Sequence, residues 1–405
     1  MGSNPIPGAI ILHPLRTFYI PMRDLNPMAF DVESVRRDFP ALADWVYLDT
    51  AFVGLMPRQV REGYDEWVNE WYRLSLEPGE TILGRWIKRT GKVRGMLASL
   101  VGARTEEIAL TTCTGSGLNI VINGTPWERG DNVVFPELEH NPAVTYTTKR
   151  MEVEPRTLQP VEGRFELSDL EKAVDDRTKL VQVSQVSYVN GFRFDLKEVA
   201  DIAHEHGAKV LVDATQAVGA LEVDYRRDGV DYVSVAPYKY LMGPAGLAFL
   251  YVSEENIPTL IPDRVGWKNQ VWEGDNPEEV EAGETAAKFE YGTIHFQGVY
   301  AIEKSLEYID RVGMKAIESQ VLSLRDHLYE RLTDARKEMY TPEDTESPIV
   351  SFMQEDAAGL AKKLMSEGIK VTGRRAHRDH IRASMHFYNT EGDIDRLIEN
   401  LSRGQ

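Results

Sequence analysis

Two segments of the sequence each run from an apolar strand into polar side chains: Leu211-Val-Asp-Ala-Thr-Gln216 and Val235-Ala-Pro-Tyr-Lys-Tyr-Leu-Met-Gly-Pro-Ala-Gly246. The first segment places Asp213 at the end of its strand, and the second places Lys239 shortly after its strand. These two residues are separated by 239 − 213 = 26 positions, which is enough for one crossover and a return strand. We therefore expect the carboxylate and the amine at the same edge of a buried sheet.

The sequence on both sides of these segments alternates short apolar runs with helical periodicity. Apolar β-branched runs predict strands, and apolar residues three and four positions apart predict helices. We expect strands at 108–112, 133–135, 180–183, 210–212, 232–235 and 247–252, and helices at 117–123 and 197–205. This alternation indicates an α/β fold whose mostly parallel sheet is covered by helices on both faces. Such sheets bind ligands beyond the carboxyl ends of their strands, where Asp213 and Lys239 are expected.

The C-terminal part has a different pattern, which predicts a smaller α+β domain. We expect helices near 299–309, 316–332 and 357–365, strands near 349–352, 369–371 and 381–384, and a last helix from about Thr390. Asp393 follows Thr390 by three positions, which approximates a capping box. We divide the chain into an N-terminal segment near the small domain (1–60), which begins as an extended arm, a large ligand-binding domain (61–290) and a small C-terminal domain (291–405).

The composition restricts the class of protein. The 405 residues include 46 basic and 64 acidic side chains, and the net charge of 46 − 64 = −18 argues against nucleic acid or anionic membranes as partners. No apolar run approaches the ~18 residues of a membrane helix, and we expect no signal peptide. Cys113 is the only cysteine, which excludes an internal disulfide and a thiolate metal cluster. We expect a cytoplasmic protein without a metal site.

Lys239 and Asp213 together suit the chemistry of pyridoxal phosphate. A Schiff base needs an amine that is neutral near pH 7, and burial lowers the pKa of a lysine toward that range. The pyridine nitrogen of the cofactor needs a carboxylate beside it, so that the nitrogen stays protonated and the ring accepts electrons. A surface lysine and a helix-capping aspartate are the alternative for each residue alone. The pair at two strand ends favours the cofactor site.

The chain resembles the class V aminotransferase group of fold-type I pyridoxal-phosphate enzymes. That group includes cysteine desulfurases, isopenicillin-N-epimerase-like proteins, kynureninase and several C–S lyases. The resemblance runs from about Tyr47 to Thr390, and its most specific parts are Asp-Ala-Thr-Gln216, the segment around Lys239 and Lys-Phe-Glu-Tyr-Gly-Thr293. It implies a seven-stranded, mostly parallel sheet in the large domain and pyridoxal 5′-phosphate as the cofactor.

The resemblance also implies a role for single residues. Lys239 would form the Schiff base and move the substrate proton. Asp213 would pair with the pyridine nitrogen, and Gln216 would lie beside the ring hydroxyl. Thr114 and Gly115 would hold the phosphate at the start of a helix, where free N–H groups and the helix dipole favour an anion.

Four more positions complete the site that the resemblance implies. His140 matches the position that stacks on the cofactor ring, with a structural histidine as the alternative, and Tyr238 is counted among the cofactor-binding residues. Thr293 resembles the residue that reaches the phosphate across a dimer interface, so a homodimer is implied. Arg382 lies where this group binds the substrate α-carboxylate, which the planar guanidinium matches with two parallel hydrogen bonds. A solvated surface arginine is the alternative for Arg382.

Several positions depart from the cysteine desulfurases. Those enzymes use a mobile cysteine ahead of the Arg-Ala-Ser segment, and residues 371–380 contain none here. Cys113 is far away in sequence, and we expect its side chain to pack rather than to act as a nucleophile. Residues that surround the cofactor in the desulfurases are replaced here by Gln185, Tyr188, Ala236 and Tyr238. These departures favour the C–S lyase and epimerase-like branches.

The expected function is removal of the α-proton of an L-amino acid by Lys239, with a C–S β-lyase on a cysteine derivative as the favoured reaction. A class V aminotransferase or an epimerase is the alternative, a cysteine desulfurase is less favoured, and a cofactor-bound regulatory protein is the non-enzymatic alternative. Basic residues at Arg374–Arg378 hint at a second substrate anion, although we prefer to interpret them as a solvated loop.

Overall fold

The structure is a computed structural model that describes residues 30–402, apart from residues 75, 139–147, 269, 273–279 and 375–377. The expected N-terminal arm therefore lies outside the described residues, and so does His140. In the described part of the chain, no helix is long and apolar enough to cross a membrane.

A seven-stranded sheet forms the centre of the large domain, with the strand order β2-β8-β7-β6-β5-β3-β4. Its strands are β2 (Ile108–Thr111), β3 (Asn132–Pro136), β4 (Glu154–Leu158), β5 (Thr178–Ser184), β6 (Lys209–Asp213), β7 (Tyr232–Val235) and β8 (Ala248–Val252). Strands β4, β3, β5, β6 and β7 are parallel to one another, whereas β8 is antiparallel to both β7 and β2. The predicted α/β fold with a mostly parallel sheet is confirmed.

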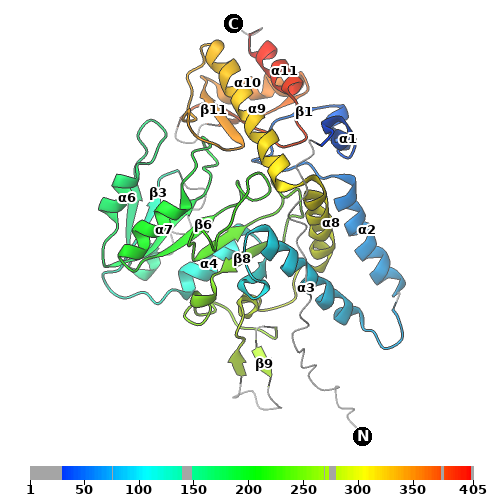
Figure 1. The fold of residues 1–405 in the computed structure, drawn as a ribbon, viewed down its shortest axis with the longest axis vertical. Coiled ribbons are helices and arrows are strands. Elements are labelled where there is room, and N and C mark those ends of the chain that lie inside the picture. The colour runs from blue at the N-terminus through cyan, green and yellow to red at the C-terminus, as the bar shows by residue number, and fades with distance from the viewer. Residues whose placement is uncertain are drawn as a thin grey trace.

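Helices cover the sheet because its inner strands are mostly apolar and buried. Strands β3, β7 and β8 are buried at every position, so each of their faces needs a cover. The helices next to the sheet are α4 (Thr114–Gly124), α6 (Leu167–Ala173) and α7 (Leu196–Glu205) (Figure 1). At Gly117 a β-carbon would lie 2.2 Å from Ser234 Oγ, so only glycine lets α4 approach β7 this closely.

Three longer helices pack beside the sheet, on the right in Figure 1: α2 (Arg58–Arg73), α3 (Ile82–Leu100) and α8 (Phe296–Val312). Aromatic side chains join them, since the Trp86 ring of α3 lies 5.7 Å from that of Trp67 in α2 and 5.0 Å from that of Phe296 in α8. Helix α8 thereby belongs to the same packed group as α2 and α3, although it follows the expected boundary at 290.

The C-terminal part has a sheet and a core of its own, at the top of Figure 1. Its elements are α9 (Met314–Asp334), β11 (Ile349–Met353), α10 (Ala357–Ser366), β13 (Thr372–Arg374), β14 (His380–Ser384) and α11 (Glu391–Ser402). The sheet order is β11-β14-β13, and both pairs are antiparallel. Thr390 N–H donates to Asp393 Oδ2 at 3.1 Å and Asp393 N–H donates to Thr390 Oγ1 at 3.3 Å, which confirms the predicted capping box.

An N-terminal segment joins this smaller unit, because β1 (Val46–Tyr47) pairs in parallel with β12 (Ile369–Lys370). Val46 and Leu48 share the small core with side chains of α9, β11 and β14. This pairing supports the proposed assignment of the segment before residue 60 to the neighbourhood of the small domain. The remaining short elements are α1 (Val32–Arg36), η1 (Pro40–Ala43), η2 (Thr105–Glu107), η3 (Glu254–Asn256), β9 (Gln270–Trp272), β10 (Val280–Ala282) and η4 (Ala286–Phe289).

Candidate active site

Three strands of the large sheet bring the predicted residues to one edge. Asp213 is the last residue of β6, and Lys239 follows the end of β7 by four positions. Strand β2 points the same way as β7, since both are antiparallel to β8, and Thr114 opens helix α4 three residues after β2. The carboxyl ends of β2, β6 and β7 therefore meet at the edge where the sequence predicts the site.

Lys239 is a buried amine without a neutralising partner. Only 7% of the residue is exposed, and it forms no hydrogen bond or ion pair with any residue that the structure describes. Burial lowers the pKa of Lys239 to about 8; the positive charges of Arg382 and Arg374 act in the same direction, and Asp213 and Asp49 oppose it. The amine is thus neutral in an appreciable fraction of molecules near neutral pH, as Schiff-base chemistry requires.

A short chain of hydrogen bonds connects Asp213 to the start of α4. The Thr215 N–H donates to Asp213 Oδ1 at 3.0 Å, and the Thr215 and Thr114 hydroxyls are hydrogen-bonded at 2.7 Å. The N–H groups of Thr114 and Gly115 have no acceptor within the helix, because they belong to its first turn. This arrangement presents free donors and the positive end of the helix dipole toward the edge that holds Asp213 and Lys239.

Gln216 and Gly54 connect the same edge to the segment after β1. Gln216 Nε2 donates to the Ala51 carbonyl at 3.1 Å, and its Oε1 is buried without a hydrogen-bond partner. The Gly54 N–H donates to the Tyr238 carbonyl at 2.9 Å, so this segment lies against the lysine loop. Ala51 N–H in turn donates to Ser384 Oγ at 2.9 Å, which joins β14 to the same group of segments.

Arg382 lies on β14 and is completely buried. Its Nη1 donates to the Tyr188 carbonyl at 2.7 Å and its Nη2 donates to Asp49 Oδ1 at 3.4 Å, while its Nε is buried and no described residue forms a hydrogen bond with it. The solvated surface arginine considered from the sequence is therefore wrong. The sequence reasoning missed Asp49 as the partner of Arg382; its only signal was its place at the end of the apolar run that contains Leu48.

Arg374 is a second guanidinium close to this edge. Its Cζ lies 4.9 Å from the centre of the Tyr188 ring, and its Nε is buried without a hydrogen-bond partner. Its charge lowers the pKa values of Lys239 and Arg382, in addition to the larger effect of burial on each. The sequence placed Arg374 only in a basic loop, and the structure places it on strand β13.

Tyr238 borders the lysine, and Cys113 lies at the start of α4. The Tyr238 ring centre lies 5.8 Å from Lys239 Nζ, and burial raises the pKa of Tyr238, with a further contribution from the charges of Asp213 and Cys113. Cys113 is exposed and precedes α4 as its N-cap residue. The expectation that its side chain packs in the interior is therefore wrong, because α4 begins at Thr114 rather than at Gly117 and leaves Cys113 on the exposed turn.

Thr293 is exposed and lies in the segment just before α8. Its expected contact with the phosphate of a partner's cofactor stays a prediction. His140 falls outside the described residues, so its stacking on the ring also stays a prediction.

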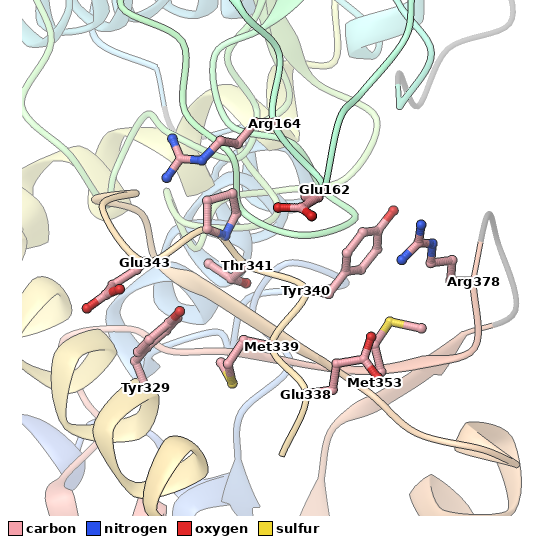
Figure 2. A pocket seen from close by; sticks show the side chains of 11 residues that line it. Glu162, Arg164, Tyr329, Glu338, Met339, Tyr340, Thr341, Glu343, Met353 and Arg378 are labelled. Atoms are coloured by element: carbon pink, nitrogen blue, oxygen red, sulfur yellow. The ribbon is translucent and has the colours of Figure 1, made fainter. Parts of the chain in front are cut away.

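A cavity of about 450 Å³ lies beside this edge rather than over Lys239. It is bounded by the segment around Glu162 and Arg164, by residues 338–343 and by Arg378 (Figure 2). Figure 2 shows the Tyr340 ring between Glu162 and Arg378, and the Arg378 guanidinium carbon lies 5.9 Å from the centre of that ring. Among the residues that the structure describes, no predicted cofactor-binding residue lines this cavity.

The donor set fits pyridoxal phosphate. A buried amine without a partner stands beside a strand-end carboxylate, and two buried polar atoms, Gln216 Oε1 and Arg382 Nε, lack a hydrogen-bond partner. Lys239 could bind the aldehyde carbon of that cofactor, Asp213 its pyridine nitrogen and Gln216 its ring hydroxyl. Thr114 and Gly115 could bind its phosphate. Arg382 is left to bind a carboxylate.

Comparison with known proteins agrees with this geometry. The family model of class-V aminotransferases matches residues 46–397. A probable cysteine desulfurase from Methanothermobacter thermautotrophicus is 30% identical over 390 residues, which cover 91% of this chain and 97% of that relative. The apo structure of a cysteine desulfurase from Thermococcus onnurineus superimposes with a TM-score of 0.84 at 27% identity, covering 92% of this chain and 98% of the other.

A third comparison extends the structural likeness to a lyase. The complex of the cystine C–S lyase C-DES with its reaction product, cysteine persulfide, has a TM-score of 0.83 over 90% of this chain and 99% of that chain. The identity of 22% is a level that shows the shared fold alone.

Fold and site together define a pyridoxal-phosphate-dependent enzyme of fold type I. The chain belongs to the class-V aminotransferase family, which confirms the resemblance seen in the sequence and the identity of the cofactor.

Proposed function

We propose that this enzyme is a C–S β-lyase that acts on a cysteine derivative. The observation that carries the proposal is the buried Lys239 amine, which has a lowered pKa and no hydrogen-bond or ion-pair partner among the described residues. It lies close enough to Asp213 and Arg382 for both charges to act on its pKa. Such an amine can remove the α-proton of an amino acid whose carboxylate Arg382 binds. The curated relative named a probable cysteine desulfurase supports a sulfur amino acid as the substrate.

The fate of the sulfur follows from the cysteine content. Residues 371–380 contain no cysteine, so the segment that precedes Arg-Ala-Ser384 offers no thiol to accept sulfur. The sulfur then leaves together with the substituent that it carries, as a thiol. This separates the proposed reaction from desulfuration, in which sulfur passes to a protein thiol.

Each residue of the edge has a defined task in this reaction. Bound pyridoxal phosphate supplies an electron sink for the electron pair that remains when the α-proton leaves. Asp213 keeps the pyridine nitrogen protonated, and the N–H groups of Thr114 and Gly115 hold the phosphate. Arg382 binds the substrate α-carboxylate through its unpartnered Nε. Lys239 Nζ, once free of the cofactor, accepts the proton from Cα.

The bond changes balance without an oxidant. The Cα–H and Cβ–S bonds break, a Cα–Cβ double bond forms, and the sulfur leaves with the bonding electron pair. The proton that Lys239 Nζ holds is available to the departing thiolate. The released unsaturated amine adds water and gives pyruvate and ammonia.

Exposure of Cys113 favours one second candidate, a cysteine desulfurase that uses this thiol as the sulfur acceptor. Cys113 is exposed at the N-cap of α4, and the next residue, Thr114, is hydrogen-bonded to Thr215, whose N–H donates to Asp213. The curated names of the relatives agree with this candidate. The product distinguishes the two reactions, because desulfuration gives alanine and β-elimination gives pyruvate.

One experiment separates these candidates. The purified protein, supplied with pyridoxal phosphate, is incubated with L-cysteine, S-alkyl-L-cysteines and ordinary amino acids, and pyruvate, ammonia and alanine are measured. We expect a yellow protein that releases pyruvate from the sulfur compounds alone. Lys239→Ala should abolish colour and turnover, whereas Lys197→Ala, an exposed lysine on α7, should change neither.

Three outcomes would contradict the lyase. Alanine as the product, lost in Cys113→Ser, would establish desulfuration. A requirement for a keto acid would establish an aminotransferase, and loss of stereochemistry without elimination would establish an epimerase.

A further inference from the structure

Arg374 and Arg382 lie on one face of the small antiparallel sheet. Thr372 on β13 is paired with Arg382 on β14, and Arg374 is paired with His380. Side chains at paired positions of an antiparallel sheet share a face, and so do side chains two positions apart on one strand. The two arginines are therefore diagonal neighbours on that face.

The carboxylate nearest to this pair is already occupied. Asp49 Oδ1 accepts hydrogen bonds from the Thr372 hydroxyl at 2.6 Å and from Arg382 Nη2 at 3.4 Å, and Lys370 Nζ lies 3.6 Å from Asp49 Oδ2. Arg374 has no such neutralisation, since no carboxylate of a described residue lies within ion-pair distance of it.

Tyr188 orients the unpaired guanidinium. The Arg374 Cζ lies 4.9 Å from the centre of the Tyr188 ring, and the Tyr188 carbonyl accepts the hydrogen bond from Arg382 Nη1. A guanidinium that packs on an aromatic ring keeps its N–H edge available for a planar anion. The Nε at this edge is buried and has no hydrogen-bond partner among the residues that the structure describes. The solvated loop that the sequence favours does not describe Arg374, which lies on a strand at the site.

We infer that the substrate carries a second anionic group on its sulfur substituent, and that Arg374 binds this group while Arg382 binds the α-carboxylate. The inference rests on the proposed lyase function for its choice of a cysteine derivative. It adds the substrate class: S-substituted cysteines that end in a carboxylate or another planar anion. Arg374 is then a specificity-determining residue, and the charge of the substrate decides which cysteine derivatives react.

The test compares two substrates of almost the same shape. S-Carboxymethyl-L-cysteine carries the second anion, and S-carbamoylmethyl-L-cysteine replaces it with a neutral amide. The holoenzyme should have a kcat/KM about tenfold or more higher for the acid, since hydrogen bonds to charged groups are the stronger ones. Arg374→Gln should remove this preference by lowering kcat/KM for the acid alone. Arg382→Gln should lower kcat/KM for both substrates.

Arg378→Gln is the matched control. Arg378 also precedes β14, but it faces the neighbouring cavity and the Tyr340 ring (Figure 2). We expect it to leave both kcat/KM values within about twofold of the unchanged enzyme, because Arg378 is exposed and solvent screens its charge. Arg374→Lys should retain part of the preference, because it keeps the charge and loses the planar hydrogen bonds.

A binding measurement keeps this inference separate from the proposed reaction. The deamino analogue of each substrate cannot react, and calorimetry gives its Kd with the holoenzyme. If no compound yields pyruvate, the lyase proposal fails, yet tighter binding of the acid that depends on Arg374 would still support the second anion site. Equal binding of acid and amide, equal losses for both in Arg374→Gln, or the same loss in Arg378→Gln would overturn it.

Discussion

The ionisation of Lys239 sets the pH at which the cofactor-free enzyme becomes reactive. Burial, helped by the charges of Arg382 and Arg374, lowers the pKa of Lys239 to about 8. Below that pH the amine is protonated and cannot attack a carbonyl, and above it the amine is neutral. Reductive methylation of the cofactor-free protein, read at Lys239 by mass spectrometry, should therefore rise through pH 8.

Lys197 provides the internal control for this titration. Its hydrogen bond to Asp201 raises its pKa, so its methylation should rise only at a pH above that of an ordinary lysine. If Lys239 and Lys197 were labelled with the same pH midpoint, the buried amine would not have the ionisation on which the mechanism depends.

Asp213 should be needed for turnover rather than for capture of the cofactor. In Asp213→Asn the amide oxygen can still accept the Thr215 N–H, so the loop that follows β6 keeps its hydrogen bond. The neutral side chain no longer stabilises a protonated pyridine nitrogen, and turnover should fall roughly 100-fold or more. The absorbance spectrum should show bound cofactor while pyruvate release is measured. Full activity of this variant would remove Asp213 from the proposed role.

At the scale of elements, the segment after β1 and the lysine loop pack too closely for a side chain at Gly54. A β-carbon there would lie 1.9 Å from the Lys239 carbonyl oxygen. Gly54→Ala should therefore destabilise the fold by roughly 1–3 kcal/mol and displace the lysine loop, which a thermal melt and a cofactor titration would measure.

Gly91→Ala is the matched substitution on α3. No atom lies within 4 Å of the added β-carbon, and alanine favours a helix, so this variant should gain about 0.5–1 kcal/mol. Equal stability changes in both glycine variants would mean that the close approach at Gly54 does not exist.

The sequence pattern was sufficient to predict the inner strands of the large sheet, but it did not predict the edge strand β4. Strands β5 to β8 each contain a short stretch of mostly apolar, β-branched residues, and such stretches can be recognised in the sequence. Strand β4 went unpredicted because its sequence Glu-Pro-Arg-Thr-Leu158 is mostly exposed and has a proline at its second position, which fits its place at the edge of the sheet.

The residues of the candidate site also differ in how far the sequence alone could predict them. Lys239 and Asp213 could be predicted because each lies at a strand end or within four residues after it, and the carboxyl ends of parallel strands meet at one edge; Thr114 came from the family resemblance. The pairing of Arg382 with Asp49 joins residues 333 positions apart, and the position of Arg374 depends on the register of β13 with β14. Neither local propensity nor periodicity contains that information.

At the scale of the whole molecule, an exposed apolar surface lies next to Thr293. Val265, Trp267 and Tyr291 are 69%, 51% and 42% exposed, and the Arg264 guanidinium carbon lies 4.9 Å from the Tyr291 ring centre, which joins the two segments. Apolar side chains gathered in this way mark a protein interface. We propose that a second copy covers them, which brings Thr293 of each subunit toward the phosphate of the other.

Disruption of this surface should dissociate the dimer and also weaken the binding of the cofactor. The wild-type protein should have the mass of two chains by light scattering. Val265→Asp combined with Trp267→Asp should give single chains, because buried unpaired carboxylates oppose association. The double variant should also bind pyridoxal phosphate more weakly, since the partner's Thr293 no longer reaches the phosphate. Val161→Asp, at a residue that is 60% exposed elsewhere on the surface, should change neither property. A wild-type monomer, or a dissociated variant with unchanged cofactor affinity, would contradict this arrangement, since each subunit would then hold its cofactor alone.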